Sequence, residues 1–424
     1  MVSTGILISF MVMIVLMILG VPVIAWLGIG TFLLLELTGA LPTSLIGESM
    51  FGALDSFPLI AIPLFILTGD VLAGTGLSTK LLDFSRSIFS GFRSALGTST
   101  LVGCGLFAAI SGSNASAAAA VGRMTHKPLS TEGYEESYAA ALIASGSSVG
   151  ILIPPSIAYI IAGVTLGISA SVLFLAAFIP GILVLVTLIL VNIIMNRKNN
   201  YEQSTGHPDL REIGTATWDA KYALLIPFII LGGIYSGIFT ATEAAAVAVT
   251  FTIIIGMGIR TLHLSDFPAM FERSAAVNGV IVPIIGVAII FSQVLSALGL
   301  PAQMVSILTS ITTNFYLIVL IMLVILMGAG AVMETTPNIL ILGPLLLPVA
   351  ESVGMDPIHF VIFMVSGLGI GFMTPPIGLN LYVMAGMTDE SVLDISRKSV
   401  PYILSMILIV FIIGIAPVIS LVLI

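Results

Sequence analysis

Long apolar runs, separated by short polar segments, dominate the hydrophobic pattern of this chain. A helix needs about 17–25 predominantly apolar residues to cross a bilayer. Two runs long enough to span, 135–165 and 358–387, are interrupted. The remaining expected spans are continuous and lie near residues 5–19, 21–38, 57–75, 171–195, 221–238, 241–259, 276–297, 315–333 and 400–423. The pattern predicts an all-α polytopic membrane protein.

Each interruption is a Pro-Pro pair, in "GILIPPSI" (150–157) and in "GFMTPPIG" (371–378). A proline inside a helix lacks the backbone N–H donor, and its ring collides with the preceding turn. We therefore expect two broken helices. The alternative at each pair is a kink that only shapes helix packing.

Two other apolar stretches, 96–125 and 334–350, carry small and polar residues in the middle of the run. We expect each to belong to a re-entrant hairpin that enters and leaves the membrane on one side. The first hairpin would cover about 96–125. The second, which includes the preceding apolar run, would cover about 315–350.

The basic residues support the hairpin at 96–125. With the N-terminus outside, all 13 Lys and Arg residues fall in loops on the cytoplasmic side, at 76–95, 123–134, 196–221, 260–275 and 388–399. Cytoplasmic loops of membrane proteins carry an excess of Lys and Arg. If 96–125 crossed the membrane, every later loop would change side and this bias would disappear. The sequence therefore predicts a periplasmic N-terminus and a cytoplasmic loop at 196–221.

The composition excludes several functional classes. Only 8% of the residues are charged, whereas soluble domains carry about 25%. A single cysteine, Cys104, excludes a disulfide framework, and the four histidines show no metal-ligand spacing. The chain contains no GxxxxGK[ST] phosphate-binding motif. Any pumping would therefore draw on an ion gradient, and no nucleic-acid partner is expected.

The interruptions also indicate an internal repeat. The Pro-Pro pairs lie at 154–155 and 375–376, and the polar clusters "ISGSNAS" (110–116) and "VMETTPN" (332–338) precede them at similar distances along the chain. We expect a first repeat over 1–200, a cytoplasmic linker over 201–221 and a second repeat of inverted orientation over 222–424. Matching interruptions in two halves of a transporter point to a binding site at the middle of the membrane.

A broken helix exposes carbonyl oxygens that can replace the water of a cation, and a helix N-terminus that favours an anion. Polar side chains near the two breaks fit this use: Ser111, Ser113, Asn114, Thr335, Thr336, Asn338, Thr374 and Asn380. An enzyme interpretation would make Ser111 or Ser113 a nucleophile. A nucleophilic serine needs a base, and the only histidine nearby in the sequence is His126.

Three acidic residues lie within or near the apolar runs. Glu334, at the tip of the second hairpin, is placed to meet an ion or solute, because intramembrane carboxylates are usually functional. Glu243 follows "TAT", which resembles a capping box, and capping is favoured there over ion binding. Asp70 is expected to pair with a neighbouring helix. Amphipathic segments at 78–94 and 264–274 fit helices lying at the cytoplasmic interface, the second shortened by Pro268.

Several motifs in this order resemble the large membrane subunit (M, or DctM-type) of tripartite ATP-independent periplasmic (TRAP) transporters. They are "FAAISGSNASAAAAVG", "GILIPPSIAYIIAG", "GIFTATEAAAVAV", "METTPNILILGPLLLPVAESVGMDPIHF" and "GFMTPPIGLNLYVMAG". The resemblance covers nearly the whole chain, which lacks the additional N-terminal spans of fused versions of the family.

The resemblance implies sodium-coupled import of an organic acid, of the sialic acid or dicarboxylate class, across the bacterial inner membrane by an elevator movement of a transport domain against a scaffold. It implies two partners, a small four-helix membrane subunit on a separate chain and a periplasmic substrate-binding protein. It implies Na⁺ sites at Ser111, Ser113, Asn114, Gly150, Ile153, Pro155, Thr335, Thr336, Gly371, Thr374 and Pro376. It also implies substrate contacts from Glu334, Asn338 and Asn380.

Three alternatives remain open at this point. A stand-alone sodium/dicarboxylate carrier would share the architecture but need no binding protein. An intramembrane enzyme would turn over without a gradient. A channel is disfavoured, because two hairpin sites suggest alternating access.

Overall fold

The computed structural model describes residues 4–202 and 209–424. Within these residues every regular element is a helix. Seven of the helices are long and apolar enough to cross a membrane. The expectation of an all-α, multi-pass membrane protein is confirmed.

The first half of the chain contains the elements α1 (Thr4–Ile18), α2 (Val23–Thr38), α3 (Leu45–Leu54), η1 (Phe57–Ile60), α4 (Ala61–Gly74), α5 (Leu77–Phe89), α6 (Ala95–Ser111), α7 (Asn114–Thr131), α8 (Glu136–Ser147), η2 (Ser148–Ile151), α9 (Ile157–Leu166) and α10 (Ala170–Asn199). The second half contains α11 (Leu210–Tyr235), α12 (Ala241–Gly258), η3 (Leu264–Asp266), α13 (Phe267–Ala297), α14 (Leu300–Ile311), α15 (Phe315–Val332), α16 (Thr335–Ser352), α17 (Pro357–Gly371), α18 (Leu379–Ala385), α19 (Val392–Ile415) and α20 (Val418–Leu421).

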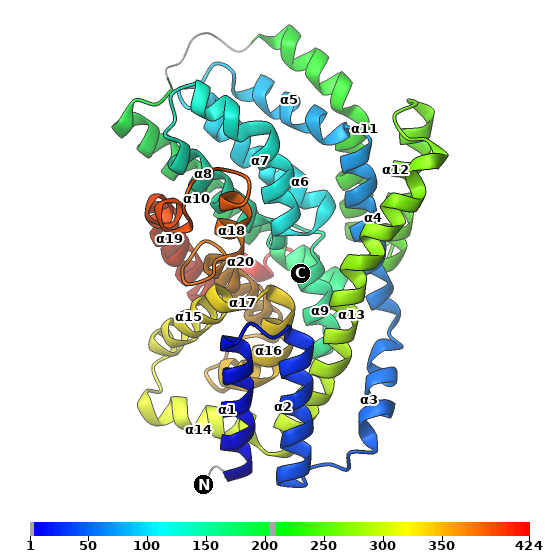
Figure 1. Ribbon diagram of the computed structural model, residues 1–424. Helices are drawn as coiled ribbons and strands as arrows, with labels where there is room; N and C mark the ends of the chain where they lie inside the picture. The colour runs from blue at the N-terminus through cyan, green and yellow to red at the C-terminus, as the bar shows by residue number, and fades with distance from the viewer. Residues whose placement is uncertain (1–3, 203–208) are drawn as a thin grey trace.

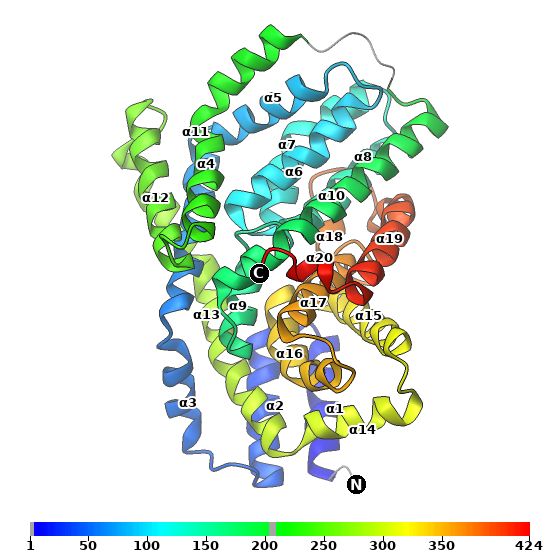
Figure 2. The ribbon, with the colours of Figure 1, turned by 180° about the vertical axis from the view of Figure 1, so that it is seen from behind.

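Six helices form a wall along one side of the molecule (Figures 1 and 2). In order of contact they are α1, α2, α13, α4, α12 and α11. The remaining long helices pack together beside this wall. The amphipathic segment expected at 78–94 is α5, which buries Leu81 and Leu82 and exposes Lys80 and Asp83. Because α5 contacts both α11 and α6, it connects the wall to the second group of helices.

Some helices extend beyond the apolar runs that predicted them. α11 begins at Leu210, within the segment expected to be a linker, and Asp209 caps it by accepting a hydrogen bond from the Arg211 N–H (2.8 Å). Residues 203–208 of that expected linker lie outside the described residues. Hydropathy marks only the apolar part of a helix, so polar first turns like that of α11 are missed.

The separate interfacial helix expected at 264–274 is wrong. Residues 264–266 form a single short turn, and Phe267 then begins the 31-residue α13. Pro268 lies in the first turn of α13, where the missing N–H has no helical partner to lose. The proline therefore starts this helix and does not shorten it. The short helices α3 and α14 were not predicted.

The first re-entrant hairpin consists of α6 and α7, which meet at a turn of Gly112 and Ser113. Its two ends are held together by the Glu202 carboxylate, which accepts hydrogen bonds from the Leu96 N–H (2.9 Å) and the Tyr134 hydroxyl (2.9 Å). Burial raises the pKa of the Glu202 carboxyl and that of the Tyr134 hydroxyl. Since both ends share one partner, the hairpin returns to the side from which it started.

The second hairpin consists of α15 and α16, which meet at Met333 and Glu334. Each hairpin is followed by a broken helix. The first consists of α8, the turn η2 and α9, with an interruption at 152–156. The second consists of α17 and α18, with an interruption at 372–378. The peptide bond within each Pro-Pro pair is cis.

The boundaries of the corresponding elements recur at one constant spacing. α7 covers 114–131 and α16 covers 335–352. α8 begins at 136 and α17 at 357, so this pair is displaced by the same interval as the first. Contacts between the halves are also reciprocal, because α9 packs on α16 and α18 packs on α7. The domain division at 200 and 222 itself stays a prediction.

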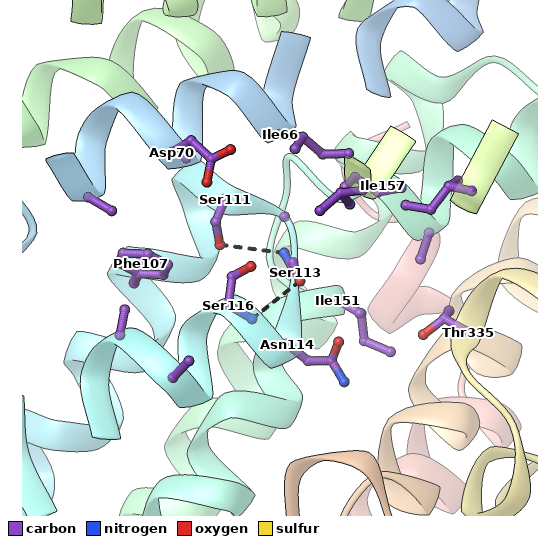
Figure 3. Close-up of a pocket in the computed structure, with 18 of the residues that line it drawn as sticks. Ile66, Asp70, Phe107, Ser111, Ser113, Asn114, Ser116, Ile151, Ile157 and Thr335 are labelled. Atoms are coloured by element: carbon purple, nitrogen blue, oxygen red, sulfur yellow. Dashed lines mark hydrogen bonds between the residues drawn. The ribbon is translucent and has the colours of Figure 1, made fainter. Parts of the chain in front are cut away.

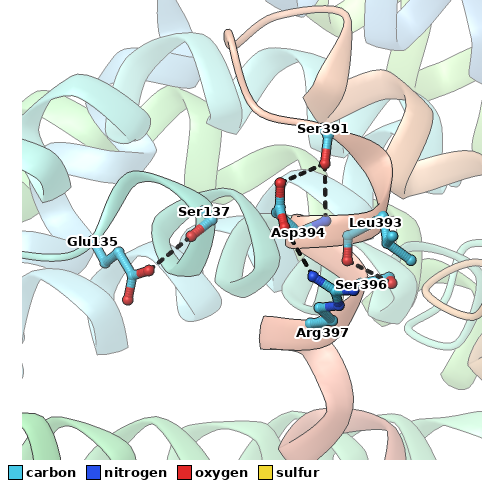
Figure 4. A network of polar contacts seen from close by, with 7 residues as sticks. All are labelled: Glu135, Ser137, Ser391, Leu393, Asp394, Ser396 and Arg397. Atoms are coloured by element: carbon cyan, nitrogen blue, oxygen red, sulfur yellow. Dashed lines mark hydrogen bonds and ion pairs between the residues drawn. The ribbon is translucent and has the colours of Figure 1, made fainter.

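The segments that carry Lys and Arg gather at one end of the molecule, opposite the N-terminus (Figure 1). There the Lys398 Nζ pairs with the Glu135 Oε2 at 2.7 Å, which joins the start of α19 to the start of α8. Ser391 caps α19 beside this pair by accepting a hydrogen bond from the Asp394 N–H (Figure 4). The shared end agrees with the charge bias, while the side of the membrane on which it lies stays a prediction.

Candidate functional site

A cavity of about 280 Å³ opens where the helical wall meets the tips of the two hairpins. The wall contributes residues of α4 and α13, and the other group contributes α7, both hairpin tips and the first break. Six residues predicted from the sequence line it: Ser111, Ser113, Asn114, Glu334, Thr335 and Thr336. Figure 3 shows Ser111 and Asp70 toward one side of the cavity and Thr335 toward the other. The fold therefore brings the two polar clusters, one from each half of the chain, to one cavity.

The first tip is ordered by its own hydroxyls. The Ser113 Oγ accepts a hydrogen bond from the Ser116 N–H (3.4 Å) and so caps α7. The Ser111 Oγ accepts one from the Ser113 N–H (3.5 Å). Both hydroxyl oxygens retain acceptor capacity, because each oxygen has two lone pairs.

The first break packs backbone to backbone against this tip. A Cβ on Gly150 would lie 2.8 Å from the Asn114 Cα, and a Cβ on Gly112 would lie 3.0 Å from the Pro155 carbonyl oxygen. Only glycine allows so close an approach. Gly150 and Pro155 thus lie beside the predicted tip residues. The Ile153 side chain packs between Gly105 of α6 and Gly181 of α10.

The second break is docked on the second hairpin in the same manner. A Cβ on Gly371 would lie 2.2 Å from the Gly330 carbonyl carbon. The Ala331 carbonyl accepts hydrogen bonds from the N–H groups of Ile377 (3.0 Å) and Gly378 (3.2 Å). A second cavity, of about 260 Å³, lies between this break and this tip.

The remaining residues predicted at the second break do not line the larger cavity. The Thr374 hydroxyl donates to the Ile370 carbonyl of its own helix (2.8 Å), and Pro376 is exposed. Glu334 lines both cavities. It is therefore the one predicted residue that an ion or solute could meet from either side of the second tip.

Asn338 and Asn380 are fully buried and line neither cavity. The Asn380 Nδ2 donates to the Ala144 carbonyl (2.9 Å), and its Oδ1 accepts from the Asn114 Nδ2 (3.2 Å). The Asn338 Nδ2 lies 3.0 Å from the Met333 carbonyl oxygen, whereas its Oδ1 has no hydrogen-bond partner in the described part of the chain. A buried amide oxygen without a donor costs about 1–3 kcal/mol. Such an oxygen could serve as a ligand for a cation.

The other two acidic residues have structural partners. Glu243 completes the capping box of α12: its Oε2 accepts from the Thr240 N–H (2.8 Å). The Asp70 Oδ2 accepts from the Ser274 hydroxyl of α13 (2.6 Å). Both expectations, capping and pairing with a neighbouring helix, are confirmed. Asp70 in addition lines the larger cavity.

The predicted position of Arg123 in a loop is wrong. Arg123 lies within α7 and lines the larger cavity. Ser116, Ala119, Ala120 and Arg123 follow the i, i+3, i+4, i+7 spacing of one helix face, and all four line the cavity. That spacing is a signal from which the residue could have been found.

His126 is not placed to act as a base for the serines at the first tip. The contact of His126 is with the Glu136 carbonyl (3.3 Å), near the base of the hairpin. It therefore does not pair with Ser111 or Ser113.

Solved structures with a similar fold are membrane transporters. The YdaH transporter of Alcanivorax borkumensis matches with a TM-score of 0.65 over 88% of this chain and 87% of that chain, at 14% identity. The efflux pump MtrF of Neisseria gonorrhoeae matches with a TM-score of 0.51 over 88% and 82%, at 12% identity. At these identities the likeness shows the fold alone.

The sequence places the chain within a particular family. Residues 10–419 match the family "Tripartite ATP-independent periplasmic transporter, DctM component", and the chain belongs to it. The C4-dicarboxylate TRAP transporter large permease protein DctM of Rhodobacter capsulatus is 31% identical over 435 residues, covering 98% of each chain. The sialic acid TRAP transporter large permease protein SiaM of Vibrio cholerae is 30% identical and covers 90% of each. The recognition from sequence motifs is confirmed.

A third relative is longer. The isethionate TRAP transporter permease protein DctMQ of Oleidesulfovibrio alaskensis is 34% identical over 397 residues, which cover 93% of this chain and 62% of the relative. The chain thus spans about three fifths of that relative's length.

Proposed function

We propose that this chain is the large permease subunit of an importer that carries an organic acid across the inner membrane, driven by sodium and supplied by a periplasmic binding protein. The observation that carries the proposal is the shared cavity: two hairpin tips and the first broken helix meet the helical wall at one place. The names of the relatives supply the cargo class, which includes dicarboxylates, sialic acid and isethionate.

Sodium coupling is supported by the chemistry of the tips. The first cluster offers the hydroxyls of Ser111 and Ser113 beside the Pro155 carbonyl. The second offers Thr335 and Thr336, followed in the same helix by Asn338, whose Oδ1 has no partner among the described residues. Hydroxyl, amide and carbonyl oxygens are the hard ligands that alkali cations accept in place of water. A cation at either tip would attract an acid in the adjoining cavity, so cargo and ion would move together.

An elevator movement is supported by the division of the cavity lining between two groups of helices. Asp70, Val277 and Ile281 come from the wall, whereas the polar tips come from the other group. Sliding of the second group along the wall would carry the tips and their ligands across the membrane without unfolding them. In this proposal the wall is the scaffold, and it is enlarged by a separate small four-helix subunit.

Uptake into proteoliposomes tests the proposal. The large and small subunits are reconstituted together, and uptake of a panel of labelled organic acids is measured with the binding protein present or absent and with sodium varied on each side. We expect uptake only with an inward sodium gradient and the binding protein. Uptake that needs no binding protein would favour a stand-alone carrier, and uptake indifferent to sodium would contradict the coupling.

A further inference from the structure

We propose that Arg123 binds the acidic group of the cargo and that the cavity selects acids that carry one negative charge and a hydrogen-bond donor at their other end. This inference rests on the proposed function, because it names the cargo class for the same cavity. It adds a residue that neither the break motifs nor the hairpin tips include.

The Arg123 side chain is bent back toward the tip of the first hairpin. Its Nε donates to the Ala119 carbonyl (3.2 Å), one helical turn closer to the tip. In a helix the side chain points toward the N-terminus, so the guanidinium covers the cavity surface between Ser116 and Arg123. The guanidinium of Arg123 therefore lies nearer to the hairpin tip than the Cα atom of Arg123 does.

The guanidinium is available for a ligand. A guanidinium has five N–H donors, and within the described residues only the Nε–H of Arg123 meets a protein acceptor. Arg123 is exposed and lines the cavity, so the four N–H groups on its two Nη atoms are accessible to a ligand. Arginine presents such donors as a planar fork, which binds the two oxygens of a carboxylate or sulfonate together.

The charge on the cavity lining is asymmetric. Arg123 is the only Lys or Arg among the lining residues of the described chain, whereas two carboxylates, Asp70 and Glu334, also line the cavity. Asp70 comes from the wall and Glu334 from the second tip. Both carboxylates therefore line sides of the cavity that α7 does not form. One Asp70 oxygen accepts from the Ser274 hydroxyl, and within the described residues the other meets no hydrogen-bond donor.

Together these positions predict how the charged and hydrogen-bonding groups of the cargo are arranged. One acidic group pairs with Arg123, and a hydroxyl or ammonium group of the cargo donates to Asp70 or Glu334. A second acidic group would instead lie beside Asp70 or Glu334, and like charges in a partly desolvated site repel strongly. Monoanionic hydroxy or amino acids, including hydroxysulfonates, should therefore be preferred over C4-dicarboxylates.

Direct binding to the purified complex of large and small subunits, without the binding protein, tests the inference. Ligands that bind the folded state raise the unfolding midpoint. In sodium buffer we expect at least one monoanion among isethionate, glycolate, taurine and N-acetylneuraminate to raise the midpoint, and succinate and malate to raise it less at equal concentration.

Variants on one helix separate binding from a general charge effect. Arg123→Gln should weaken monoanion binding by about tenfold or more, the loss expected for a charge-assisted fork. Arg123→Lys should recover part of it. Lys127→Gln removes the same charge one turn further along α7, outside the cavity lining, and should change binding by less than about twofold. Asp70→Asn should improve the response to succinate.

The inference is overturned if succinate shifts the wild-type midpoint as much as the best monoanion, if Arg123→Gln binds like Lys127→Gln, or if Asp70→Asn leaves the succinate response unchanged. It is also overturned if no monoanion shifts the midpoint while the complete system transports an acid. That last result would leave the proposed function intact. Absence of uptake of every acid by the complete system would instead reject the proposed function.

Discussion

Single glycines decide whether the breaks can dock. Gly150 and Gly371 each lie against the backbone of their own hairpin, at distances where no Cβ fits. In each case the atom opposite belongs to the backbone, which cannot move aside as a flexible side chain can. Both positions are therefore sensitive to the addition of a single methyl group.

Replacing Gly371 by alanine should both destabilise the protein and abolish uptake. The added methyl carbon would lie 2.2 Å from the Gly330 carbonyl carbon, so the break and hairpin must separate, at a cost of about 1–3 kcal/mol. The readouts are the unfolding midpoint and sodium-driven uptake. Gly328→Ala is the matched control, because that helical glycine has open space around it. Equal behaviour of the two variants would contradict the docking argument.

At the residue scale the sequence predicted positions better than contacts. The tip residues Ser111, Ser113 and Asn114 are where the motif indicated, and they line the cavity. Asn380 lies beside them, but its buried side chain is hydrogen-bonded to Asn114 and to the Ala144 carbonyl. A sequence gives the chemistry of an amide side chain but not its partners, which here come from the opposite half of the chain.

At the scale of elements, the hydrogen bonds of Asn380 join the two halves beside the first tip. The Asn114 Nδ2 of the first hairpin donates to the Asn380 Oδ1 of the second broken helix, and Asn380 in turn donates to the carbonyl of Ala144 in the first broken helix. All three groups are buried. The first tip and the second break are therefore coupled directly.

Asn114→Ala and Asn380→Ala should be non-additive. Either change breaks the shared bond, so the double variant should be less destabilised than the sum of the single variants by about 1 kcal/mol. Unfolding midpoints at fixed sodium concentration give the coupling. Asn114→Ala combined with Asn278→Ala, on α13 of the wall, serves as the comparison pair and should be additive. Additivity in both pairs would show that the bond does not matter.

Hydropathy predicted the apolar elements of this fold but misplaced several ends. The bounds of α1, α2 and α15 lie close to those of the predicted runs. By contrast, α11 begins at Leu210 instead of 221, and α13 at Phe267 instead of 276, because their first turns are polar or amphipathic. The short α14 carries polar residues on one face, so no apolar run marks it. Periodicity, not mean hydropathy, is the signal for such helices.

At the scale of the whole molecule, the proposed elevator requires the wall and the hairpin tips to move apart. Gly69 of α4 and Ser111 at the first tip are one point of contact, because a Cβ on Gly69 would lie 3.3 Å from the Ser111 Cβ. The usual separation of two disulfide-bonded Cβ atoms is about 3.5–4.5 Å. A cross-link at this point would hold the two groups in the arrangement seen here.

Gly69→Cys with Ser111→Cys should form a disulfide that stops transport. The only native cysteine, Cys104, is replaced by serine to leave a single pair. We expect the uptake that the reduced double variant retains to be lost on oxidation and regained on reduction, with the same protein serving as its own control. Full transport by the oxidised, quantitatively cross-linked protein would rule out relative movement at this contact.

The shared carboxylate of Glu202 restricts where bending can occur. Because it holds both ends of the first hairpin, the hairpin cannot splay at its base while these hydrogen bonds persist. The covalent path from α5 into the hairpin then bends most easily at residues 90–94, where Ser94 already has a left-handed backbone (φ 78°). Spin labels placed on α4 and α7 would consequently report a changing separation during a transport cycle, whereas labels on α6 and α7 would report a constant one.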